Sequence, residues 1–165
     1  VALRLRCRVS KQRFIMTNAT LEAELLNRGQ EAFAGQAFSA MVGARLVSLS
    51  PQGAEIRLPV KPDLLQQHGF VHGGVLAYLA DNALTFAGGA ALGGGVVTAE
   101  MKVNYVRPAI GVELIARAHA VSGGRTMAVA RCDIHVWDGE AERLCAVAQG
   151  TVARMGQEPP AQARA

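Results

Sequence analysis

Residues 68–82, which read HGFVHGGVLAYLADN, combine the residue types that hydrolytic chemistry needs within a short stretch. His72, Gly73 and Gly74 precede an apolar run, and a single carboxylate, Asp81, interrupts that run. A helix that begins at Gly73 would offer free backbone N–H groups and a positive dipole end to a polarised oxygen. A carboxylate in apolar surroundings is destabilising unless it is paired, protonated or used in chemistry. These features indicate the two halves of a hydrolytic site.

The elements that must position this stretch follow from hydrophobic periodicity and turn residues. Helices are expected over 19–33 and 73–90. Strands are expected over 38–49, 53–60, 96–107, 112–121, 126–137 and 143–154. Because the second helix is apolar on nearly every side, it must be buried, and consecutive antiparallel strands can wrap around it. The sequence predicts an α+β fold in which a curved antiparallel five- to six-stranded sheet surrounds a central helix.

The formal net charge of +4 is concentrated at the N-terminus. Five basic residues and no acid lie in the first fifteen positions, which leaves twelve basic against thirteen acidic residues, or −1, from residue 16 onward. The organisation expected is a basic tail over 1–18, one domain over 19–155 and a disordered tail over 156–165. A basic tail can contact nucleic acid or anionic membrane, or act as a transit peptide, unless Met16 is the natural start. For the domain we expect neither a nucleic-acid nor a membrane partner.

A membrane span is the competing interpretation of residues 75–97, which carry one charge. The central Asp81 and Asn82, the break at Gly93-Gly94-Gly95 and the alternating strands nearby all favour a buried core helix instead.

Cysteine usage points to a reducing compartment. Cys7, Cys132 and Cys145 are odd in number and lack Cys-x-x-Cys spacing, so reduced thiols in a cytoplasmic protein are expected. No spacing of Cys or His residues suggests a metal site, and no cofactor is expected.

Three segments together resemble a known family. They are Gln66-x-x-Gly69-x-x-His72-Gly73-Gly74 with Asp81 nine residues after the histidine, Asn104-Tyr105-Val106-Arg107-Pro108, and Gly124-Arg125-Thr126. Over about residues 38–154 the chain resembles the PaaI-type acyl-CoA thioesterases of the hotdog fold. The resemblance implies hydrolysis of acyl-CoA thioesters to a free acid and coenzyme A by a homodimer, with two dimers commonly paired.

Spacing gives an independent reason to expect a site shared between two chains. Gly73 and Asp81 are eight residues apart, which is about 12 Å along a helix axis. Each group must come within about 3 Å of the reacting atoms. Two antiparallel helices related by a two-fold axis would meet this need. The Gly73 N–H of one chain would hold the oxyanion, and Asp81 of the other would act as general base or nucleophile.

Supporting roles follow from the resemblance. Gln66 occupies a position where relatives usually carry Asn, whose amide orients substrate or water. Thr98 aligns with a hydroxyl residue that supports the attacking water, although it can also be an ordinary strand residue. His72 is a candidate catalytic residue, and the alternative is a structural hydrogen bond at the helix start.

The substrate-binding candidates are Gly74, Arg107 and Arg125. The arginines lie beside turns and could contact coenzyme A phosphates or remain solvated. The glycines could serve only a tight helix entry, and Asp81 could be a structural acid. A non-catalytic acyl-CoA sensor is the alternative function, and the spacing from His72-Gly73-Gly74 to Asp81 disfavours a hydratase.

Overall fold

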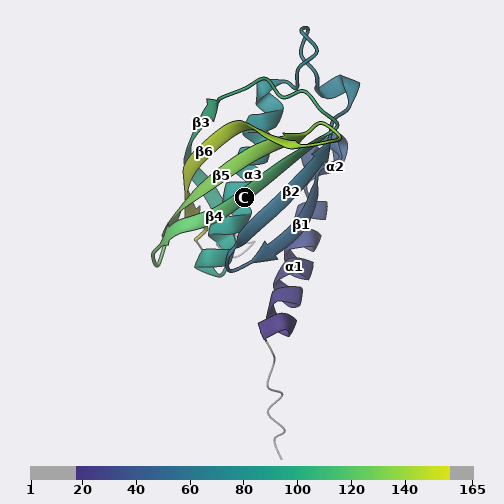
Figure 1. Cartoon of the computed structure of the whole chain (residues 1–165). Coiled ribbons are helices and arrows are strands. Elements are labelled where there is room, and N and C mark those ends of the chain that lie inside the picture. Colours follow the sequence, from purple (N-terminus) through teal and green to yellow (C-terminus); the bar gives the residue numbers. More distant parts are fainter. Residues whose placement is uncertain (1–17, 157–165) are drawn as a thin grey trace, which may run out of the picture.

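The computed structural model describes residues 18–156, and the chain forms one curved sheet around a long helix (Figure 1). The helices are α1 (Asn18–Ala34), α2 (Ala37–Val42), η1 (Pro62–Leu64) and α3 (Gly73–Leu92). The strands are β1 (Arg45–Ser50), β2 (Gly53–Pro59), β3 (Val96–Tyr105), β4 (Glu113–Gly123), β5 (Met127–Trp137) and β6 (Glu142–Arg154). Of the predicted tails, 1–17 and 157–165 lie outside the described residues, as does Cys7.

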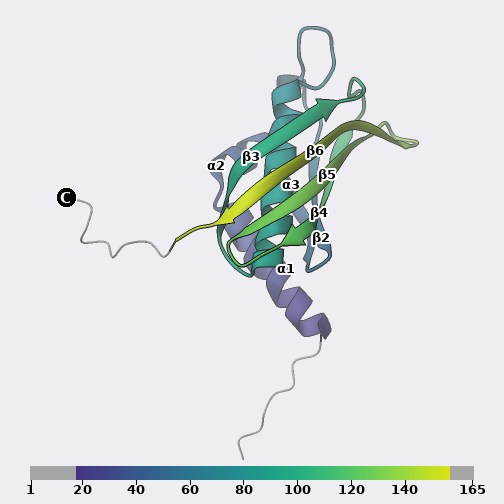
Figure 2. The same ribbon diagram turned by 90° about the vertical axis from the view of Figure 1, so that its left-hand side faces the viewer.

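The sheet has six strands in the order β1-β2-β4-β5-β6-β3, and every neighbouring pair is antiparallel. The predicted α+β architecture is therefore confirmed. Seen from the side in Figure 2, β3 forms the near edge of the sheet and α3 lies against its inner face. β1 and β3 are the two edge strands, so each has one unpaired side in a single chain.

The α3 helix is buried because its side chains fill the concave face of the sheet. Leu79, Ala83 and Leu84 of α3 are completely buried, as are Ile56 and Leu114 of the sheet. By length and apolar composition α3 could cross a membrane, but it is the core helix of this fold, as predicted. It ends at Gly93, which adopts the left-handed conformation with φ of 71°.

Small residues let the sheet approach α3 closely. A Cβ added at Gly150 of β6 would lie 2.7 Å from the Glu100 carbonyl oxygen and 3.2 Å from Leu84 of α3. A Cβ at Gly88 of α3 would overlap Val152 of β6. The close contact between α3 and the β3-β6 side of the sheet therefore depends on glycine.

The prediction of a strand over 38–49 is wrong in its first half. Residues 37–42 form α2, and the strand begins only at Arg45. Gly43 ends α2 in the left-handed conformation, with φ of 85° and ψ of 27°. The Ser39 hydroxyl accepts a 2.6 Å hydrogen bond from Tyr78, and Phe38 packs edge-on against the same ring. Contact with α3 therefore selects a helical turn where the residue types alone suggested a strand.

The outer face of the sheet carries a network of ion pairs. Arg117 of β4 contacts Glu55 at 2.8 Å and Glu142 at 2.5 Å, and Arg57 of β2 contacts Glu55 at 2.7 Å. Burial raises the pKa of Glu55, but its hydrogen bonds to Arg117 and Arg57 outweigh burial, so the net pKa is lowered. Ion pairs therefore join the strands on the outer face, whereas apolar side chains pack on the inner face.

Candidate active site

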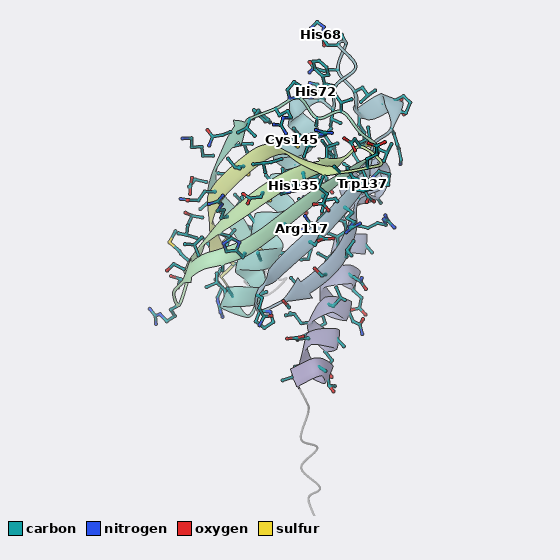
Figure 3. The ribbon with its side chains drawn as sticks, viewed as in Figure 1. His68, His72, Arg117, His135, Trp137 and Cys145 are labelled. Atoms are coloured by element: carbon teal, nitrogen blue, oxygen red, sulfur yellow. The ribbon has the colours of Figure 1, made fainter. Side chains whose placement is uncertain are left out.

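The start of α3 is anchored by a loop that doubles back on itself. Leu65 and Val71 form an isolated antiparallel bridge, and the N–H of His72 donates to the Leu64 carbonyl at 2.8 Å. The N–H of Val71 donates to the Ala109 carbonyl at 3.0 Å, which ties the loop to the segment before β4. Figure 3 shows His68 at the tip of this loop and His72 at its base. The backbone that enters α3 is therefore fixed from both sides.

His72 is the N-cap of α3. Its Nδ1 accepts a 2.9 Å hydrogen bond from the N–H of Gly74, and its carbonyl accepts from the N–H of Val75 at 2.9 Å. Within residues 18–156 the remaining first-turn donor, the Gly73 N–H, has no acceptor. The cap thus satisfies the neighbouring donors and leaves the Gly73 N–H available to a ligand at the positive end of the helix.

A pocket of about 310 Å³ opens at this helix start. Its lining brings together three residues that the sequence selected: Gln66, Gly73 and Arg107. Tyr105 also lines it, and the Tyr105 hydroxyl donates a 3.1 Å hydrogen bond to the Gly73 carbonyl. Gln66 is half-buried and its backbone N–H donates to Phe70 at 2.8 Å, so the loop geometry holds it at the pocket wall.

Asp81 lies further along α3 in a cluster of hydroxyl groups. The half-buried Asp81 carboxylate accepts a 2.6 Å hydrogen bond at Oδ1 from the hydroxyl of Thr98 on β3. The Thr85 hydroxyl donates to the Asp81 carbonyl at 2.7 Å and lies 3.0 Å from the Thr98 hydroxyl. Asn82 does not hold the carboxylate, because its amide donates to the Tyr78 carbonyl at 3.3 Å. A carboxylate held by a short hydroxyl contact is oriented, and no hydrogen bond within residues 18–156 occupies its second oxygen.

One chain does not bring these two groups to a common point. The pocket that Gly73 lines does not include Asp81, and helix geometry separates the two residues by about 12 Å along the axis. Arg125 lies in the β4-β5 turn, near the C-terminal end of α3, whereas Arg107 lies near its start. Within one chain the arginines are therefore at opposite ends of the helix.

Sequence reasoning did not select two residues that the structure places at these sites. Thr85 is four residues after Asp81 on α3, and a polar residue at this helical spacing was a usable signal. Tyr105 belongs to a segment that the family resemblance used, but nothing in the sequence connected its hydroxyl with Gly73.

Other titratable groups lie away from the site. Burial raises the pKa of Cys132 to about 12 and that of Cys145 to about 11, so neither thiol is ionised near neutral pH. Both are free and lie in strands, as predicted. Burial also raises the pKa of Tyr78, against the opposing effect of its bond to Ser39. Within residues 18–156 no group of three or more His, Cys, Asp or Glu side chains could hold a metal ion.

Comparisons with known proteins identify the family. A family model described as Thioesterase superfamily matches residues 68–143. Acyl-coenzyme A thioesterase 13 of Mus musculus is 33% identical over 91 residues, which cover 54% of this chain and 65% of that protein.

Solved structures agree with that match. A thioesterase family protein from Silicibacter pomeroyi has a TM-score of 0.73 at 33% identity, covering 80% of this chain and 99% of that one. A variant of the phenylacetic acid degradation protein PaaI from Thermus thermophilus has a TM-score of 0.63 at 31% identity, covering 73% and 100%. The chain therefore belongs to the thioesterase superfamily and has the hotdog fold, with PaaI proteins among its structural relatives.

Proposed function

We propose that this protein hydrolyses acyl-CoA thioesters to a free carboxylic acid and coenzyme A. The observation that carries the proposal is the oriented Asp81 carboxylate of α3, which accepts a 2.6 Å hydrogen bond from Thr98 of β3. The same helix begins at Gly73, whose backbone N–H has no acceptor within residues 18–156. An acid with a structural role does not require a free backbone donor at the start of its helix. Acyl transfer requires both a base or nucleophile and a donor for the oxyanion. The likeness to an acyl-coenzyme A thioesterase supports this choice of substrate.

The proposed active unit is a homodimer built on the open edge of β3. Thr98, the residue that orients Asp81, belongs to this edge strand, so Asp81 lies on the side of α3 nearest to the open edge. A second copy related by a two-fold axis would add its own β3 there and lay its α3 antiparallel to the first. Gly73 of one chain would then lie beside Asp81 of the partner subunit. We further propose that two dimers pair and that the protein is cytoplasmic.

In the proposed reaction the Gly73 N–H binds the thioester carbonyl oxygen and stabilises the oxyanion that forms on it. Asp81 of the partner subunit either removes a proton from water, which then adds to the carbonyl carbon, or attacks that carbon itself. In both routes the carbon–sulfur bond breaks and the thiolate of coenzyme A takes up a proton. If Asp81 attacks, water then hydrolyses the anhydride and restores the carboxylate.

The remaining candidates position the substrate. Gln66 lines the pocket beside Gly73 and would orient the thioester or the water through its amide. Arg107, also at this pocket, and Arg125 from the other subunit would contact phosphates of coenzyme A. His72 would act through the cap that leaves the Gly73 N–H free.

The test of the reaction is thiol release over a panel of acyl-CoA substrates. Wild type should hydrolyse at least one member, and Asp81→Ala and the isosteric Asp81→Asn should lose most of that rate while remaining folded. Wild-type turnover in Asp81→Ala would overturn the mechanism. Tight acyl-CoA binding without turnover across the panel would support the sensor instead.

Mixing two inactive variants tests whether the site is shared. Gly73→Pro removes the oxyanion donor and Asp81→Ala removes the carboxylate, so neither homodimer has an intact site. A mixed dimer regains one intact site of two, and random mixing should restore about a quarter of wild-type activity. If both groups acted within one chain, mixing would restore nothing. Light scattering on the same samples measures the oligomeric state.

A further inference from the structure

A second, larger pocket lies along the C-terminal half of α3. It has a volume of about 530 Å³ and is lined mainly by residues of α1, α3 and the glycine segment 93–95 that follows α3. Small residues line both helices at this point: Gly29 and Ala32 on α1, and Gly89 and Ala90 on α3. The volume falls within the range of about 300–1,000 Å³ that is usual for small-molecule sites.

Thr85 belongs both to the lining of this pocket and to the hydroxyl groups around Asp81. Thr85 lines the pocket, donates to the Asp81 carbonyl at 2.7 Å and lies 3.0 Å from the Thr98 hydroxyl. Along α3 the lining begins at Thr85, one helical turn after Asp81, and continues through Gly89 and Ala90 to Gly93. Thr85 and Gly93 are eight residues apart, which corresponds to about 12 Å along the helix axis. A group attached to the thioester carbon beside Asp81 could therefore run into this space.

The lining is chemically suited to hydrocarbon. Apart from Arg28, Gln36 and Thr85, every residue around the pocket is apolar or glycine. The side-chain oxygen of Gln36 accepts a 2.5 Å hydrogen bond from Ser39, and the Thr85 hydroxyl is engaged with the α3 backbone. Arg28 is exposed. The lining therefore offers few hydrogen-bond partners to a polar or charged acyl group.

We propose that this pocket receives the acyl group and that the substrates are thioesters of apolar acids of medium chain length. The proposal rests on the proposed function, because it places the thioester carbon beside Asp81. Ala32 and Ala90 then determine chain-length specificity, since larger side chains at either position would fill the space that the distal carbons occupy.

The test uses a series of non-hydrolysable coenzyme A thioethers with ethyl, butyl, octyl and dodecyl groups. For wild type, affinity should rise by about fourfold per added methylene until the pocket is filled. In Ala90→Leu and Ala32→Leu this rise should stop at a shorter chain, which would weaken dodecyl binding by about tenfold or more. Ala91→Leu is the matched control, because Ala91 is exposed on the same helix and does not line the pocket. It should keep the wild-type profile.

These outcomes are independent of catalysis. If Ala90→Leu and Ala32→Leu are folded by circular dichroism and keep the wild-type chain-length profile, the acyl assignment is overturned. Should Ala90→Leu fail to fold, Ala32→Leu decides alone, because Ala32 is exposed on α1. Failure of the proposed reaction appears separately, as absent thiol release from true thioesters, because the thioethers report binding only.

Discussion

Gly73→Pro removes the one backbone donor that the proposed mechanism needs and leaves the helix start intact. Proline is favoured at the first position of a helix, where its missing N–H breaks no intrahelical bond. The preceding residue, His72, already has φ of −63° and ψ of 135°, which is the extended conformation that a following proline requires. The Gly73 N–H has no acceptor within residues 18–156, so no hydrogen bond of the described chain is lost.

Gly73→Ala is the matched control, because alanine keeps the N–H. A Cβ at this position would lie 3.5 Å from the nearest atom of the Tyr105 ring, which is an ordinary van der Waals contact. Loss of one oxyanion donor lowers kcat by about 10²–10³, or about 2.7–4 kcal/mol of transition-state stabilisation. The proline variant should show this loss relative to the alanine variant, and both should melt near the wild-type temperature.

Thiol release with the best acyl-CoA substrate measures the comparison, with kcat and KM determined separately. We expect the loss in kcat, because the donor binds the oxyanion more strongly than the ground-state carbonyl. A folded Gly73→Pro protein with kcat within threefold of Gly73→Ala would refute the role of this N–H.

Three further predictions concern Thr98, Glu55 and the two buried cysteines. Thr98→Val should lower kcat by about 10- to 150-fold, the equivalent of about 1.5–3 kcal/mol for a hydrogen bond to a charged group, while Thr98→Ser keeps most activity. Equal rates in the two variants would contradict the orienting role of the hydroxyl. Because the pKa of Glu55 in the folded protein lies below its ordinary value of 4.5, the Glu55 carboxylate stabilises the fold at pH values above 4.5. This contribution is lost as the pH falls through the lowered pKa. In urea titrations, the unfolding free energy of Glu55→Gln should therefore decrease less steeply below pH 4.5 than that of wild type. The same pH dependence in both proteins would contradict a stabilising role of the Glu55 carboxylate. Finally, burial raises the pKa of Cys132 to about 12 and of Cys145 to about 11, so iodoacetamide should label both only after unfolding, as read by peptide mass spectrometry.

The sequence predicted the elements whose patterning is local. The α3 helix is apolar nearly all round and ends at a glycine cluster, and the strands after it alternate between turns, so their positions were predicted to within two residues. Segment 38–49 was misassigned because its apolar residues fit a strand as well as a helix. The deciding interactions, Tyr78 with Ser39 and with Phe38, join residues about forty positions apart and leave no local signal.

The same distinction applies to the site. Gln66, Gly73 and Arg107 come together because two loops meet at the start of α3, and their motifs were visible in the sequence. Thr98 was selected by the family resemblance, and the structure adds the 2.6 Å hydrogen bond through which it orients Asp81. The contact between the Tyr105 hydroxyl and the Gly73 carbonyl depends on how β3 crosses α3, which the residue pattern does not encode.

β3 connects both halves of the proposed site to the edge of the sheet. Its first half holds Asp81 through Thr98, and its last residue, Tyr105, holds the Gly73 carbonyl. Both contacts depend on the register of one strand, and that strand has an unpaired side in a single chain. A partner strand added there would restrain this register at both ends at once. In the proposed dimer, the interaction that brings Gly73 to Asp81 of the partner subunit therefore also stabilises the geometry of each group, so weakened dimerisation should lower kcat before it unfolds the domain.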